Sequence, residues 1–144
     1  MKMSKLLTLA LVLFLSGGAN AQDASFNAGS GTAPEGGSGT LSMTMDNSGH
    51  EIAGWSLGVC NDTSVATVSA ANSGADTETA KNGSAPDFNQ IGVFPEGVTQ
   101  GVVLCFTGCA VVADVSGFEM LTVDYDGIAE GTTDIAFCDT LGAP

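Results

Sequence analysis

The chain has 144 residues and is strongly acidic: 16 Asp and Glu stand against 3 Lys and Arg, giving a formal net charge of -13. A protein that binds nucleic acid or an anionic membrane through charge needs several cations on one face, so this composition excludes both classes of partner. The length predicts one domain of ordinary size, and a hydrophobic content of 44% is enough to fill its core.

Residues 1–21 have the order of a secretory signal. Two lysines lie near the start, an apolar run covers residues 6–15, and Ala-Asn-Ala at 19–21 supplies the small residues that a signal peptidase reads. We predict a signal peptide cleaved before Gln22, and Sec-type export from a bacterial cell. The apolar run is too short to cross a bilayer, so we expect no membrane insertion.

Removal of this segment sharpens the charge imbalance. All 16 acidic residues lie at or beyond Asp23, whereas Lys81 is the one Lys or Arg after residue 21. Such a surface repels itself, and salt screens that repulsion. A saline habitat and the general acidity of secreted bacterial β-proteins both account for this pattern.

The first half of the exported chain alternates with period two. Residues 22–39 are rich in Gly, Ser and Ala and are interpreted as a flexible lead-in with at most a short strand near Phe26, before a single domain over 40–144. Two strands then place apolar residues on one face, first Leu41, Met43 and Met45, and next Ala53, Trp55, Leu57 and Val59. Residues 71–87 are small and polar and are expected to form a loop.

The second half repeats the strand pattern. Thr107-Gly108 indicates a tight reversal, after which a strand is expected to resume over 110–113. The apolar phases of the other strands contain Val98, Gln100, Val102, Leu104 and Phe106, then Leu121, Val123 and Tyr125, then Thr133, Ile135 and Phe137. No stretch keeps a helical period for three turns. These short alternating strands predict an all-β fold, an antiparallel two-sheet β-sandwich of jelly-roll or immunoglobulin-like type.

A further strand would usually follow the turn at Asp139, but the sequence ends at Pro144. Three alternatives stay open: the fold closes without that strand, the sequence is part of a longer protein, or a partner supplies the strand by β-addition.

Four Cys in an exported chain indicate two disulfides, although three connectivities are open from the count alone. Cys60, Cys105 and Cys138 are out of phase with the apolar face of their strands, so we expect them on an outer face or at a strand end. Cys105 and Cys109 flank a reversal that brings them together, which leaves Cys60 with Cys138. Redox or zinc chemistry is disfavoured, because there is no C-x-x-C and the lone His50 is far from any Cys pair.

The inventory of catalytic groups is thin, and we expect no enzyme. His50 is the only base available to a catalytic triad, and no G-x-S-x-G motif is present. A pair of carboxylates could be chosen for sugar hydrolysis, but acidic residues are so abundant in this chain that such a pair does not indicate catalysis. Trp55 and Tyr125 share the phase of their strands' apolar residues, which favours the core over a sugar-stacking platform.

Calcium is the most credible ligand. Asp124 and Asp126 point to the same side of a strand end beside a turn, and Glu130 or Asp134 could complete the shell with backbone oxygens. A solvated strand edge and loop explains the same residues, because no loop has a known calcium-binding spacing.

The segment 52–59 followed by 61–68 resembles the cohesin-type pattern in which a strand reading v-x-G-f-x-f-x-v runs into Y-D-P-s-v-L-x-v. Here the two segments read IAGWSLGV and NDTSVATV. The resemblance extends over roughly residues 40–138. Three later segments are similar to the middle and closing strands of that family: Gly101–Leu104, Glu119–Val123 and Gly131–Ile135.

This resemblance implies a nine-stranded jelly-roll sandwich that acts as a protein-interaction module, in the family by gripping a calcium-loaded dockerin. Similar domains occur in secreted bacterial proteins with no known cellulosome. Asn61 and Thr63 stand where the family pattern has Tyr and Pro, and four Cys are added. No binding residue is carried over to this chain.

We therefore expect a secreted, non-catalytic adhesion or assembly module of cohesin-like type. Its partner would be another secreted or cell-surface protein, dockerin-like in nature, or a polysaccharide. The alternative is a calcium-dependent carbohydrate-binding module that uses the four acidic residues named above.

Overall fold

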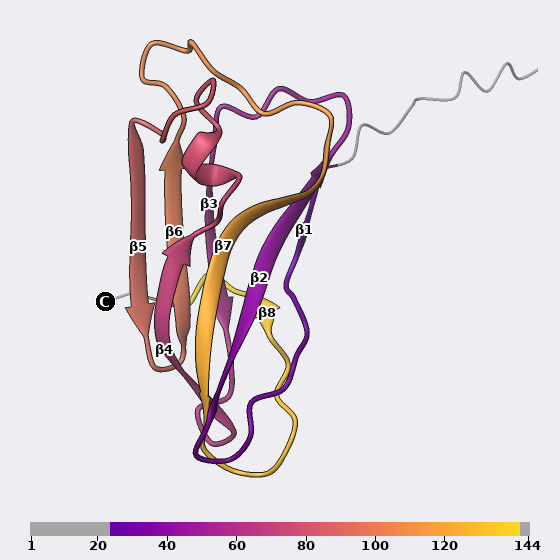
Figure 1. Cartoon of the computed structure of the whole chain (residues 1–144), viewed down its shortest axis with the longest axis vertical. Helices are drawn as coiled ribbons and strands as arrows, with labels where there is room; N and C mark the ends of the chain where they lie inside the picture. The colour runs from indigo at the N-terminus through magenta and orange to yellow at the C-terminus, as the bar shows by residue number, and fades with distance from the viewer. Residues whose placement is uncertain (1–23, 142–144) are drawn as a thin grey trace, which may run out of the picture.

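The computed structural model describes residues 24–141, which form two packed antiparallel sheets (Figure 1). The described helical element is the short 3-10 turn η1 (Thr77–Thr79). The predicted signal peptide and its cleavage before Gln22 lie outside the described residues. The strands of the described part are β1 (Ala24–Asn27), β2 (Ser38–Asn47), β3 (Gly54–Cys60), β4 (Ala66–Ser73), β5 (Phe88–Phe94), β6 (Gly97–Val103), β7 (Val115–Gly127) and β8 (Ala136–Phe137).

The strand order is β1-β2-β7-β4 in one sheet and β5-β6-β3-β8 in the other, and all pairings are antiparallel. The predicted antiparallel sandwich is therefore confirmed. Eight strands occur within residues 24–141, one fewer than the resemblance implies. β1 is the short strand that the sequence indicates near Phe26, and it pairs with β2.

The core lies between the two sheets, where the predicted alternation is confirmed in β2, β3, β6 and β7. The last predicted strand, with Thr133, Ile135 and Phe137, is wrong in part: it is reduced to β8, and Phe137 is 39% exposed. Trp55 and Tyr125 are both core residues, 7% and 4% exposed. The Trp55 ring meets the Phe118 ring edge-on, with centroids 5.8 Å apart. Ala53 is exposed, contrary to expectation, because β3 begins only at Gly54.

A buried glutamine joins the sheets across this core. Gln100 of β6 is 1% exposed and accepts a hydrogen bond from Nε1 of Trp55 at 3.1 Å. Its own amide nitrogen donates to the Met120 carbonyl of β7 at 3.0 Å and to Oδ1 of Asn89 at 3.2 Å. The polar residue that the sequence places in an apolar phase is therefore hydrogen-bonded through both ends of its amide, which offsets the cost of its burial.

The end of β6 overturns three expectations. The strand stops at Val103, so the predicted phase does not continue: Phe106 is 70% exposed and Cys105, predicted on an outer face, is 7% exposed. The chain turns instead, with the Gly108 amide donating to the Cys105 carbonyl at 3.0 Å. The expected strand over 110–113 is reduced to a single bridge between Ile52 and Val112.

The predicted loop over 71–87 is also wrong in part. β4 continues to Ser73 because it pairs with the long strand β7, and η1 follows within the same stretch. The sequence reasoning did not find β5 either. Polar residues at the end of β4 lie on the outer face or the margin of the sheet, where small polar side chains are compatible with a strand.

The structure contains the disulfides Cys60–Cys138 and Cys105–Cys109, the same pairs that spacing and strand phase predict. The first joins β3 to the segment after β8 across 78 residues, whereas the second closes a sequence separation of 4. The longer closure restricts the unfolded chain far more.

We expect the double variant Cys60→Ala/Cys138→Ala to lose about 4 to 5 kcal/mol of unfolding free energy and Cys105→Ala/Cys109→Ala about 2 kcal/mol, from loop-closure entropy. Urea denaturation of both variants and the wild type measures the difference. Equal losses in the two variants would contradict the assignment of the larger constraint to Cys60–Cys138.

Asp46 connects three strands at a register irregularity between β2 and β7. Its carboxylate accepts hydrogen bonds of 2.8 Å from the hydroxyl of Ser116, the amide of Gly117 and the side chain of Asn27 on β1. The Ser116 and Gly117 bonds, followed by that of Asn27, hold the pKa of Asp46 below its usual 3.8.

Since the pKa of Asp46 is lowered on folding, its ionised form stabilises the fold above pH 3.8, and this contribution is lost as the pH falls through the lowered value. We expect the wild type to be more stable than Asp46→Asn near neutral pH and the gap to close in strong acid. Chemical denaturation of both proteins across this range tests the expectation. A gap independent of pH would contradict it.

Candidate interaction surface

The outer face of the β5-β6-β3-β8 sheet carries an open groove of about 860 Å³. Its floor is built from small residues that cross-strand pairing brings into two rows, because alternate residues of paired strands share a face. One row is Ser56, Gly101 and Gln90, and the other is Gly58, Thr99 and Gly92.

Aromatic side chains border this floor at both edges of the sheet. Phe88 and Phe94 belong to β5 and lie on its outer face. Phe137 belongs to β8 on the opposite edge and pairs with the buried Val59, so it lines the groove from the inner side of that edge. Phe88 is 41% exposed and Phe137 is 39% exposed. Phe137 packs against Phe26 of β1 with ring centroids 6.0 Å apart, so this border also bridges the two sheets.

The β8 border is fixed to the sheet by covalent and hydrogen bonds. The Cys138 amide donates to the Gly58 carbonyl at 2.9 Å, and Cys138 is bonded to Cys60 at the end of β3. A Cβ on Gly58 would lie 2.6 Å from the Cys138 carbonyl oxygen, so only glycine permits this close approach. The groove is consequently bounded by a rigid wall.

Gly101 keeps the centre of the groove open. A Cβ at this position would lie 3.5 Å from Cε1 of Phe88, an ordinary contact distance. A larger residue is therefore compatible with the strand and would fill the space between Phe88 and the floor.

Charged groups are scarce in the groove. Of the described residues that line it, Asp139 alone carries a charge. His50 lies in the connection between β2 and β3, and its carbonyl accepts a hydrogen bond of 2.7 Å from the side chain of Asn47. It lines neither this groove nor the second cavity. The chemistry available in the groove is apolar contact and hydrogen bonding.

The second cavity, of about 410 Å³, lies between residues 29–33 and 129–135 and is lined by Tyr125. The Tyr125 hydroxyl is buried and has no hydrogen-bond partner among the described protein groups. Burial raises the pKa of Tyr125 to about 12, so the hydroxyl stays protonated at ordinary pH. An unpaired buried hydroxyl is a cost that the fold tolerates at this site.

We expect Tyr125→Phe to leave the unfolding free energy unchanged or raise it by roughly 1 kcal/mol, since the substitution removes an unpaired polar atom and keeps the ring. Thermal and urea denaturation measure this, with Trp55→Phe as the matched control that breaks a made hydrogen bond. A clear loss of stability in Tyr125→Phe would show that the hydroxyl has a partner.

The four predicted calcium ligands are spread over the strand end and the following connection. Asp124 and Asp126 lie on the outer face of β7, and Asp124 accepts a hydrogen bond of 2.5 Å from the Thr40 hydroxyl. Glu130 and Asp134 are exposed between β7 and β8. Within residues 24–141, no three Asp, Glu, His or Cys side chains form a group that could hold a metal ion. Calcium binding stays a prediction.

Sequence reasoning missed the groove because it missed β5. Phe88, Gln90, Gly92 and Phe94 face outward, whereas Asn89, Ile91 and Val93 alternate with them. Both sets mix apolar and polar residues, so period-two patterning does not separate an inner from an outer face. The usable signal is the aromatic residue at each end of this stretch.

Within residues 24–141, no helix has both the length and the apolar character needed to cross a membrane.

No protein-family model matches the sequence, and no curated protein matches it either. Solved structures do match the fold. A non-cellulosomal cohesin from the hyperthermophilic archaeon Archaeoglobus fulgidus is 15% identical, with a TM-score of 0.52 over 81% of this chain and 78% of that one. CaCohA2 from Clostridium acetobutylicum is 13% identical, with a TM-score of 0.54 over 83% of this chain and 81% of that one. The chain has a cohesin-like fold.

Proposed function

We propose that the protein is a secreted, non-catalytic assembly or adhesion module that binds another secreted or cell-surface protein through the groove of the β5-β6-β3-β8 sheet. The observation that carries this proposal is the groove itself, with its floor of small residues, its aromatic borders and its disulfide-fixed wall. The cohesin-like fold supports it, because the sequence resemblance to that family implies a protein-interaction module.

The composition of the groove favours a protein segment as its occupant. Aromatic side chains are enriched at protein interfaces, where a few side chains that become buried on binding supply most of the binding energy. A rigid border lowers the entropy lost on binding, since little has to be ordered when the partner arrives. The acidic surface adds repulsion against nucleic acids and anionic lipids.

The alternative, a calcium-dependent carbohydrate-binding module, has less support. The acidic residues at the end of β7 do not form an assembled ligand set within the described residues. Trp55 and Tyr125, the aromatic residues best suited to stacking on sugars, are buried in the core.

The proposal predicts that Gly101→Val weakens partner binding without unfolding the protein, because the new side chain fills the groove next to Phe88. The matched control is Asn72→Val, which adds the same side chain to the exposed outer face of β4 on the other sheet. Immobilised wild type and variants are exposed to the secreted and cell-surface proteins of the source organism. A discrete partner should be retained by the wild type and by Asn72→Val.

Once that partner is purified, calorimetry should show an affinity at least about tenfold weaker for Gly101→Val, equivalent to 1.4 kcal/mol of lost binding free energy. Retention of no partner by the wild type, or equal affinity of the two valine variants, would overturn the proposed function.

A further inference from the structure

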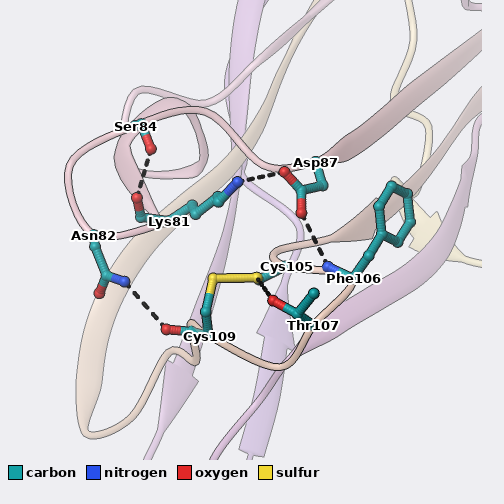
Figure 2. Close-up of polar contacts among 8 residues, drawn as sticks. All are labelled: Lys81, Asn82, Ser84, Asp87, Cys105, Phe106, Thr107 and Cys109. Carbon is teal, nitrogen blue, oxygen red and sulfur yellow. Dashed lines mark hydrogen bonds and ion pairs between the residues drawn. A yellow bond between two sulfur atoms is a disulfide. The ribbon is translucent and has the colours of Figure 1, made fainter.

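The disulfide-closed loop Cys105–Cys109 presents Phe106 to solvent. Phe106 is 70% exposed, the highest value among the large hydrophobic side chains in the described part of the chain. Cys105, directly before it, is 7% exposed and packs into the core. The backbone on one side of Phe106 is thus anchored while its ring points away from the disulfide (Figure 2).

The loop is rigid in its own right. The disulfide joins its two ends, and the Gly108 amide donates to the Cys105 carbonyl at 3.0 Å. Gly108 has a φ of 73°, a conformation that glycine adopts without strain. The Thr107 hydroxyl lies 3.2 Å from Sγ of Cys105. The residues around Phe106 therefore have little freedom to bury its ring elsewhere.

The segment before β5, which contains Lys81, Asn82 and Asp87, makes hydrogen bonds to the loop Cys105–Cys109, as Figure 2 shows. Oδ2 of Asp87 accepts a hydrogen bond of 3.0 Å from the Phe106 amide, and Oδ1 of Asp87 pairs with Nζ of Lys81. The Asn82 side chain donates to the Cys109 carbonyl at 3.2 Å. The hydrogen bond from Lys81, ahead of that from the Phe106 amide, lowers the pKa of Asp87, so this support persists through neutral pH.

A purely structural role would leave no reason to expose the ring. A disulfide, a turn bond and two contacts from the neighbouring loop fix the backbone, yet the large apolar side chain that they position stays in water. An exposed Phe side chain forgoes the favourable free energy that its burial would give. A partner surface that covers the ring would recover it, and the rigid loop reduces the ordering cost of docking.

The loop is connected to the border of the groove. Asp87, which holds the Phe106 amide, directly precedes Phe88 of the groove wall. Phe88 pairs in register with Val103, the last residue of β6, and both are exposed. The chain leads from Val103 into the disulfide loop within two residues. Phe106 therefore belongs to the same end of the sheet as the Phe88 border.

The net negative charge of the protein indicates which kind of partner would cover Phe106. Lys81 is the one Lys or Arg in the chain after residue 21, and its ammonium group is already paired with Asp87. A second copy of this chain would bring another strongly acidic surface to the loop and be repelled. A basic protein surface is attracted instead, because its positive charge complements the excess of acidic residues in this chain.

We propose that the loop Cys105–Cys109 is a docking tip that inserts Phe106 into an apolar pocket of a partner protein, with Lys and Arg of the partner around that pocket. This inference rests on the proposed function and deepens it, since the tip extends the same binding face beyond the groove. The pairing of Lys81 with Asp87 positions the tip and does not itself contact the partner.

The test uses a displayed library of random peptides selected on the full-length exported protein at low salt. We expect enrichment of peptides that combine Lys or Arg with aromatic or large aliphatic residues. Enriched peptides should bind Phe106→Ser at least about tenfold more weakly than the wild type. Val111→Ser, which removes another exposed hydrophobic side chain outside the loop, should bind them as the wild type does.

Two further readouts separate the tip from a general effect on stability. Phe106→Ser should have the same melting temperature as the wild type, because little of the Phe106 ring is buried. Raising the salt concentration should weaken peptide binding to the wild type, since it screens the attraction between basic peptides and the net negative charge of the protein.

The outcomes also separate this inference from the proposed function. Binding lost in Phe106→Ser and kept in Gly101→Val would support the tip and count against the groove. Binding kept in Phe106→Ser and lost in Gly101→Val would support the groove and overturn the tip. Enrichment of no peptide, enrichment of acidic peptides, or self-association of the wild type would each overturn the docking tip as stated.

Discussion

The pairing of β7 with both β2 and β4 is the constraint on which the rest of the structure depends. Strand β7 runs through the middle of its sheet, and its inward residues fill the centre of the core. The carbonyl of Met120 on this strand also accepts the hydrogen bond from Gln100 of the facing sheet. Because Gln100 lies on β6 beneath the groove, the position of the groove is set through β7 rather than by the groove residues alone.

The outer faces of the two sheets differ in how many of their polar and apolar side chains are free to contact another molecule. The β2-β7 face carries Thr, Ser and acidic side chains that bond to one another, as Thr40 does with Asp124 and Ser42 with Glu119. Such a face has its polar groups satisfied and interacts well with water. The opposite face combines small residues with exposed Phe side chains. A binding partner gains more by covering that second face, since it removes apolar surface from water without breaking an internal network.

Much of the fold follows from local patterning. Period-two alternation predicted the strands around Met43, Trp55 and Val123 and placed their side chains in the core, because one face of each strand is wholly apolar. The Cys pairing followed from the spacing of Cys105 and Cys109 around a reversal, which left Cys60 with Cys138. The patterning failed at the end of β6, where Phe106 continues the apolar phase in sequence but the strand stops at Val103. The place where a strand ends depends on its neighbours, which a local pattern does not contain.

The acidic character, the sandwich class and the disulfide framework of this protein could all be read from the amino-acid sequence, since charge, periodicity and Cys spacing are properties of short stretches of chain. The location of the groove, in contrast, depends on how the strands assemble. The groove requires β5, β6, β3 and the segment around Cys138 to meet, and the exposed ring of Phe106 requires Asp87 and Lys81 from another loop. These contacts join residues far apart in sequence, and their geometry arises only when the two sheets have packed.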